Sequence, residues 1–239
     1  KNLMPDRGGP IMEIIRTTGL GESLLAEQVE PLMAGFPGVE IAYCARPGEV
    51  DLRLTGPPTA GVKQAAAKIR ETLGEIVFAN SDQSLEEVVV EQLAALNRTV
   101  ATAESCTGGL ISHRLTSVPG SSTVFVGGVV AYSNQIKIHA LGVKSETLEK
   151  FGAVSPQTAA EMAEGVRRCF GSDYALSTTG IAGPGGGTPT KPVGLVHIGL
   201  AAPAGTQTVE KHFQMDRATF KHMVGQTALD LLRKALLKK

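Results

Sequence analysis

The chain contains 239 residues, of which 42% are hydrophobic and 19% are charged, and its formal net charge is zero. These values are typical of a globular protein and argue against global disorder. No apolar run reaches about 18 residues, so a membrane span is not expected. Aromatic residues make up only 4%, whereas proteins that stack bases usually contain more. The three cysteines fit neither a disulfide framework nor a zinc site, which favours a reducing, cytoplasmic location.

The charges are distributed unevenly along the chain. Residues 1–95 contain 8 Lys and Arg against 14 Asp and Glu, whereas residues 96–239 contain 15 against 9. The acidic first part argues against nucleic-acid binding there, and the second part is too weakly basic to indicate DNA. A mildly basic part is compatible with a small anionic ligand, so a nucleic-acid partner is not expected.

The first part of the chain alternates rapidly between strand and helix patterns. The patterns predict strands over 11–16, 39–46, 50–54 and 75–79 and helices over 21–33 and 59–73. Together they predict a small α+β domain over residues 1–82, which ends at the polar segment 80–84. Ser84 and Glu87 form a capping-box pattern, which predicts a further helix over 85–96.

The second part, residues 83–239, is longer and more regular. Strands are predicted over 99–103, 123–132, 174–179, 193–201 and 206–213, and helices over 106–117, 134–141, 155–169 and 216–237, with one more that begins at 145. The apolar, β-branched run 123–132 predicts a buried strand. His197 lies in an apolar strand and is expected to be a core residue with satisfied polar atoms. The order of elements predicts an α/β sandwich around a mixed sheet.

The first candidate site lies where the strand 99–103 ends and the next helix is expected to begin. The first amides of a helix have no partner within it, and two glycines allow close approach of a ligand. Ser105 is a candidate nucleophile and Cys106 its competitor. The remaining candidates in this stretch are Glu104 as a ligand or orienting carboxylate, and Thr107, Gly108 and Gly109. The alternative interpretation is an ordinary helix cap.

Three further segments carry candidate residues. Tyr132 and Lys137 follow the end of a strand, where ligands bind in α/β folds, although an edge-packed Tyr and a surface Lys are an alternative. The loop 180–192 is long for a connection, and its amides are candidates for an anion site at Gly183, Gly185, Gly186 and Thr188. Arg217 has a planar fork suited to phosphate or carboxylate, or is part of a solvated helix start. The five histidines have no metal-ligand spacing, so no metal is expected.

Five motifs in order resemble the CinA C-terminal family over about residues 85–239. They are AESCTGG at 103–109, GGVVAYSN at 127–134, GAVS at 152–155, TGIAGP at 179–184 and KPVG at 191–194. The resemblance implies a three-layer sandwich around a mixed sheet. Residues 11–80 resemble the KH-type middle domain of full-length members. The segment 35–38 matches the short glycine loop of a KH module but lacks basic residues, so it does not indicate RNA binding.

The family resemblance implies hydrolysis of the carboxamide of nicotinamide mononucleotide to nicotinate mononucleotide and ammonia. It carries the catalytic roles to Ser105, Tyr132 and Lys137 and implies no cofactor. A lysine acts as a base only when it is neutral, so burial or nearby positive charge must lower its pKa. The resemblance also implies a homodimer, and the chain is expected to lack the N-terminal domain of full-length members. The family often has Arg where this chain has Lys221, and Gly where it has Met215.

Two alternatives remain open at this point. The chain is either a non-catalytic nucleotide-binding, regulatory module of a competence- or damage-inducible protein, or an interaction protein linked to DNA uptake or repair. Turnover separates the first alternative from an amidohydrolase, and salt-dependent DNA binding would support the second.

Overall fold

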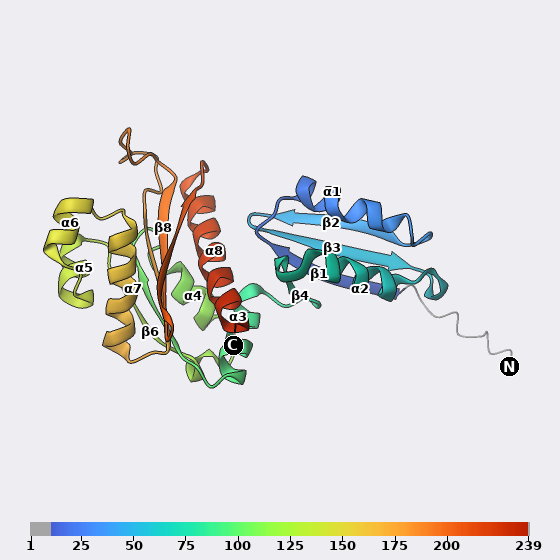
Figure 1. The fold of residues 1–239 in the computed structure, drawn as a ribbon, viewed down its shortest axis with the longest axis horizontal. Coiled ribbons are helices and arrows are strands. Elements are labelled where there is room, and N and C mark those ends of the chain that lie inside the picture. The colour runs from blue at the N-terminus through green and yellow to red at the C-terminus, as the bar shows by residue number, and fades with distance from the viewer. Residues whose placement is uncertain (1–10, 239) are drawn as a thin grey trace. The chain divides into compact units, whose positions relative to one another are not determined.

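The computed structural model describes residues 11–238, which divide into two compact units (Figure 1). The first unit ends at Ser84 and the second begins at Leu85. Within the described residues no helix is long and apolar enough to cross a bilayer.

The first unit is an antiparallel sheet with two helices. Its elements are β1 (Ile11–Thr18), α1 (Glu22–Met33), β2 (Glu40–Arg46), β3 (Glu49–Gly56), α2 (Val62–Leu73) and β4 (Val77–Ala79). The strand order is β2-β3-β1-β4. One face of α2, with Ala65, Ala66 and Ile69, is buried in a core that also contains Leu52 and Leu54. The strand predicted from residue 75 begins only at Val77, because Gly74–Ile76 form a 3-10 turn.

The second unit contains a mixed five-stranded sheet. Its elements are α3 (Leu85–Ala95), β5 (Val100–Glu104), α4 (Leu110–Thr116), β6 (Phe125–Val130), α5 (Asn134–Leu141), α6 (Ser145–Phe151), α7 (Pro156–Phe170), β7 (Tyr174–Gly180), β8 (Leu195–Ala202), β9 (Gly205–His212) and α8 (Arg217–Leu237). The strand order is β6-β5-β7-β8-β9. Strands β5, β6 and β7 run parallel, and β8 and β9 are added antiparallel.

Helices cover both faces of this sheet, which makes three layers. Helix α7 packs on β5, β7 and β8, and α5 and α6 pack against α7. Helices α3, α4 and α8 form the opposite layer, visible beyond the sheet from α7 in Figure 1. The predicted sandwich around a mixed sheet is confirmed. Because the parallel strands occupy one side of the sheet, their carboxyl ends meet at one edge, where ligands bind in such folds.

The prediction that 123–132 forms a buried strand is wrong. The strand is shorter and lies at the edge of the sheet, with β5 as its one neighbour. Its side chains alternate between intermediate and exposed positions, and Val126 and Val130 are 42% and 50% exposed. An apolar run indicates that a strand forms, but it does not indicate whether that strand has a neighbour on both sides or lies at the edge of the sheet.

The prediction of a helix over 106–117 is also wrong in its first turn. Helix α4 begins at Leu110, and Gly108 and Gly109 have φ values of +62° and +94°. These angles are outside the helical range and are readily adopted by glycine. The residues that follow β5 therefore form a turn, and this turn carries the first group of candidate site residues.

Close packing of α5 against α7 depends on Gly165. A Cβ atom added there would lie 1.9 Å from the carbonyl oxygen of Leu141, at the end of α5. A backbone atom cannot move aside as a side chain does, so any larger residue must separate the two helices.

We predict that Gly165→Ala lowers the free energy of unfolding by about 1–3 kcal/mol, which is the usual cost of overpacking a core. Urea denaturation measures this change. Glu164→Ala, at the adjacent exposed position of the same helix, is the matched control and should change stability by less than about 0.5 kcal/mol. Equal stabilities of the two variants would contradict the role of Gly165 in helix packing.

Candidate active site

A cavity of about 220 Å³ lies at the carboxyl ends of the parallel strands. Ser105 follows β5, Tyr132 follows β6 and Gly180 ends β7, and all three line it. The other lining residues are Cys106, Asn134, Lys137, Ala153, Val154, Thr179, Ala182 and Arg217. The topology therefore brings together five candidates from three segments that are widely separated in the sequence: Ser105 and Cys106, Tyr132 and Lys137, and Arg217.

Lys137 contacts Ser105 directly. The lysine lies in the first turn of α5, whose start is capped by the Ser133 hydroxyl, which accepts from the Ile136 amide at 3.3 Å. Its Nζ atom lies 3.1 Å from Ser105 Oγ and donates to the carbonyl of Ala131 at 2.8 Å. A longer contact of 3.4 Å joins Nζ to the carbonyl of Tyr132. The backbone between β6 and α5 therefore holds the amine against the serine hydroxyl.

The surroundings of Lys137 favour a neutral amine. The residue is only 1% exposed, and burial lowers its pKa below the ordinary value. A neutral amine has two N–H groups and one lone pair. In this geometry the two carbonyls accept the N–H groups, and the lone pair is available to the hydroxyl of Ser105. This arrangement allows the lysine to accept the serine proton.

Cys106 is buried beside the pair but is not activated. Burial raises the pKa of its thiol to about 12, so it is protonated at neutral pH. Because the thiolate is the reactive form, the environment does not prepare Cys106 as a nucleophile.

Glu104 holds the turn that carries Ser105. Its Oε2 atom accepts from the amides of Gly109 at 2.9 Å and Ile111 at 3.1 Å. Its Oε1 atom accepts from the amide and the hydroxyl of Ser112, both at 2.8 Å. The carboxylate thus occupies the start of α4, which leaves Glu104 outside the lining of the cavity. The contacts describe the orienting carboxylate, one of the two roles that the sequence offered, and substrate contact by Glu104 stays a prediction.

The turn after β5 is anchored on its other side by β7. The amide of Ser105 donates to the carbonyl of Thr178 at 2.9 Å. The hydroxyls of Thr107 and Thr178 lie 2.7 Å apart, and Thr107 is fully buried. The amides of Thr107 and Gly108 have no hydrogen-bond partner among the described residues. They are therefore free donors close to the serine.

Arg217 connects the cavity to the glycine-rich loop. Its Nη2 atom donates to the hydroxyl of Tyr132 at 3.1 Å, and its Nη1 atom donates to the carbonyl of Gly183 at 2.9 Å. Tyr132 is 64% exposed, and its recorded side-chain contact is with Arg217, not with Ser105 or Lys137. Arg217 begins α8, which Asp216 caps by accepting from the amides of Ala218 and Thr219.

Several predicted binding residues lie outside this cavity. Gly183, Gly185, Gly186 and Thr188 belong to the loop between β7 and β8, and none of them lines it. Substrate contact by these four residues, and by Thr107, Gly108 and Gly109, stays a prediction. Residues 11–238 contain no group of three or more His, Cys, Asp or Glu side chains placed to hold a metal ion.

The structure adds lining residues that the sequence did not single out. Thr179 is at the end of β7, Val154 lies between α6 and α7, and Asn134 begins α5. Asn134 and Val154 belong to the GGVVAYSN and GAVS motifs, which was the available signal. Their position around one cavity follows from the order of strands, which local patterns do not record.

The fold and the site define an α/β protein in which a buried lysine contacts a serine at the end of a parallel strand. A family model of the CinA C-terminal domain matches residues 82–236, and a model of the damage-inducible protein CinA KH domain matches residues 13–79. The chain therefore belongs to the CinA family, as its motifs indicated.

Similar proteins carry names of the same family. A CinA-like protein of Kosmotoga olearia is 44% identical over 233 residues, which cover 94% of this chain and 56% of that protein. A putative competence-damage inducible protein of Clostridium botulinum is 42% identical over 231 residues, with coverages of 94% and 56%. The chain thus spans about half the length of these relatives.

Solved structures of the family match the larger part of the chain. The competence/damage inducible protein CihA of Agrobacterium tumefaciens has a TM-score of 0.62 and 44% identity, and the match covers 64% of this chain and 94% of that one. A competence or damage-inducible protein of Enterobacter asburiae has a TM-score of 0.61 and 31% identity, with coverages of 65% and 99%.

We predict that Glu104→Gln lowers the free energy of unfolding by about 1–3 kcal/mol, because the new amide NH₂ must face a donor on either side of the carboxyl position. Urea denaturation is the measurement. Glu149→Gln, at an exposed position of α6, is the control and should change stability by less than about 0.5 kcal/mol. If Glu104→Gln were as stable as the wild type, the carboxylate would not be what holds the start of α4.

Proposed function

We propose that the chain is an amidohydrolase that converts nicotinamide mononucleotide and water to nicotinate mononucleotide and ammonia. The observation that carries this proposal is the 3.1 Å contact between Lys137 Nζ and Ser105 Oγ in a buried setting. A serine hydroxyl is a weak nucleophile until a base takes its proton. Membership of the CinA family supports the choice of substrate.

The first half of the reaction forms an acyl-enzyme. Lys137 takes the proton of Ser105 while Oγ attacks the carboxamide carbon, and the carbonyl electrons move to oxygen. When the tetrahedral intermediate collapses, Lys137 returns the proton to the departing nitrogen, and the C–N bond breaks to release ammonia. The positively charged pyridinium of the substrate disfavours a charged lysine nearby, which keeps the resting amine neutral and assists the return of the proton to the departing nitrogen.

The second half releases the acid. Water gives a proton to the neutral Lys137 and attacks the ester carbon, and the collapse of the second intermediate returns that proton to Ser105 Oγ. In both intermediates the negative oxygen needs preorganised donors. The amides of Cys106 and Thr107, next to the nucleophile, are the proposed donors.

Tyr132 and Arg217 have a supporting part in this proposal. Arg217 orients the Tyr132 hydroxyl at 3.1 Å, at the side of the cavity that Asn134 also lines. The phenol is placed to hydrogen-bond a bound substrate. Its proposed role is to orient the ligand, since its recorded side-chain partner is Arg217 rather than Lys137.

We predict that Ser105→Ala abolishes ammonia release from nicotinamide mononucleotide, with a loss of at least about 1,000-fold, because no acyl-enzyme can form. Cys106→Ala is the matched control, and it should retain most of the activity because its thiol is protonated. An enzyme-coupled ammonia assay measures both. An active Ser105→Ala with an inactive Cys106→Ala would indicate a thiol amidase, and tight binding without turnover by the wild type would indicate a regulatory module.

We predict that kcat/KM rises with pH and reaches a plateau below the ordinary pKa of lysine. The lowered pKa of Lys137 makes the active, neutral form available at lower pH than in a free lysine. The bound pyridinium should move the inflection of kcat to a still lower pH than that of kcat/KM. Steady-state ammonia release across pH 6–10 tests this, and a rate that falls as pH rises would exclude Lys137 as the base.

A further inference from the structure

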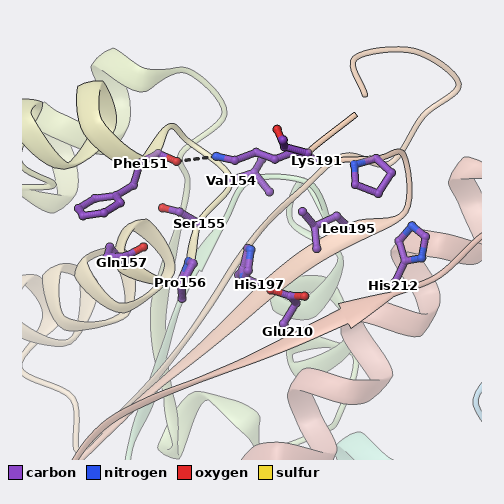
Figure 2. Close-up of a pocket in the computed structure, with 12 residues that line it drawn as sticks. Phe151, Val154, Ser155, Pro156, Gln157, Lys191, Leu195, His197, Glu210 and His212 are labelled. Atoms are coloured by element: carbon purple, nitrogen blue, oxygen red, sulfur yellow. Dashed lines mark hydrogen bonds and ion pairs between the residues drawn. The ribbon is translucent and has the colours of Figure 1, made fainter. Parts of the chain in front are cut away.

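The cavity at Ser105 is small for a complete nucleotide. Its volume of about 220 Å³ is below the roughly 300–1,000 Å³ common for small-molecule sites. A second cavity of about 590 Å³ lies between the start of α7, the segment that precedes β8, and strands β8 and β9 (Figure 2). Val154 lines both cavities, so the two are neighbours on either side of this residue.

Lys191 brings a positive charge to the second cavity. Its Nζ atom donates to the carbonyl of Phe151 at 2.5 Å, across the top of the cavity in Figure 2. The ammonium group has three N–H donors, and it has no carboxylate partner among the described residues. One donor is used by the carbonyl, and the others are available to a ligand.

The start of α7 adds an unpaired amide to the same cavity. Ser155 caps the helix and accepts from Thr158, and Pro156 has no N–H group. The amide of Ala159 donates to the Ser155 carbonyl. Gln157 is therefore the residue of this first turn whose amide has no partner in the structure. The start of a 15-residue helix with a free amide attracts an anion.

His197 is the independent sign that this cavity accepts a polar ligand. The residue is only 4% exposed, and its Nδ1 atom has no hydrogen-bond partner. The expectation of a satisfied core histidine is therefore wrong. A buried polar atom without a partner is costly, and this side chain lines the cavity between Val154 and Glu210 in Figure 2.

Glu210 is the one acidic side chain that lines this cavity. Its Oε2 atom lies 3.8 Å from His197 Nδ1, and its side chain is 69% exposed, so solvent screens its charge. Burial lowers the pKa of His197, so the form that lines the cavity is the neutral imidazole, which carries one N–H donor. His212, also at the cavity, has its Nε2 atom 2.9 Å from the carbonyl of Val193. The wall also includes the apolar side chains of Phe151 and Leu195.

We propose that this second cavity binds the phosphomonoester end of the ligand whose carboxamide lies at Ser105, with Lys191, His197 and the Gln157 amide as its donors. The inference rests on the proposed function for the identity of the ligand. It assigns the phosphate to residues other than Arg217 and the turn after β5 that contains Gly108 and Gly109.

Binding of ribose 5-phosphate, measured by calorimetry on the full chain, tests the site without any need for turnover. We expect Lys191→Met to weaken binding roughly 10- to 100-fold, the range for one charged hydrogen bond, and Lys191→Arg to restore most of it. Lys211→Met, at an exposed neighbouring position of β9 outside the cavity, is the matched control and should bind as the wild type does. His197→Phe is a second variant that removes a donor without touching the Phe151 contact.

A kinetic comparison then links the site to the substrate. Lys191→Met should lower kcat/KM for nicotinamide mononucleotide about 10- to 100-fold, mainly by raising KM. The kcat/KM for nicotinamide riboside, which has no phosphate, should be nearly unchanged. Absence of ribose 5-phosphate binding by the wild type would overturn the inference. Binding as tight as that of the wild type by both Lys191→Met and His197→Phe, when both are folded, would also overturn it. So would a phosphate preference that is lost in Lys221→Met but kept in Lys191→Met. Lys191-dependent binding without ammonia release would uphold the site and refute the proposed reaction.

Discussion

A buried amine held against a serine hydroxyl is the contact on which the chemistry of this site depends. Lys137 is nearly inaccessible to solvent, and its recorded hydrogen-bond partners are Ser105 Oγ and two backbone carbonyls. Burial without a carboxylate partner disfavours the ammonium form. The same environment that makes this lysine costly to bury is what would make it a base at moderate pH.

The rest of the second unit maintains this contact from three directions. Glu104 binds the start of α4 and fixes the turn that carries Ser105, and the Thr178 carbonyl anchors the Ser105 amide from β7. Ser133 caps α5, which carries Lys137. Gly165 permits α7 to lie against the end of α5. None of these groups touches the cavity at Ser105, but each one positions an atom that does.

In the proposal for ligand binding, the two cavities have different parts. The smaller one contains the reactive pair, and the larger one has a cation, a helix start and an unsatisfied imidazole. A ligand with an amide at one end and an anion at the other would use both.

Much of the fold was predictable from local patterns. Pro156 after Ser155 marked the start of α7, and Asp216 marked the start of α8, because capping groups act on neighbouring amides. Family motifs identified Ser105, Tyr132 and Lys137 as candidates. The patterns failed at residues 106–109, where two glycines with positive φ interrupt the expected helix, and at β6, whose apolar residues lie at a sheet edge.

The sequence alone therefore determined the types and approximate positions of the elements, the family and the candidate nucleophile. Only the tertiary structure decided that Lys137 is buried beside Ser105, that Glu104 holds the start of α4, that Arg217 donates to the Tyr132 hydroxyl and that Nδ1 of His197 has no hydrogen bond among the described residues. The physical reason is the distance along the chain over which each interaction acts. Helix caps and turns depend on neighbours a few positions away, whereas burial, desolvation and hydrogen bonds across the sheet depend on strand order and on residues tens of positions apart.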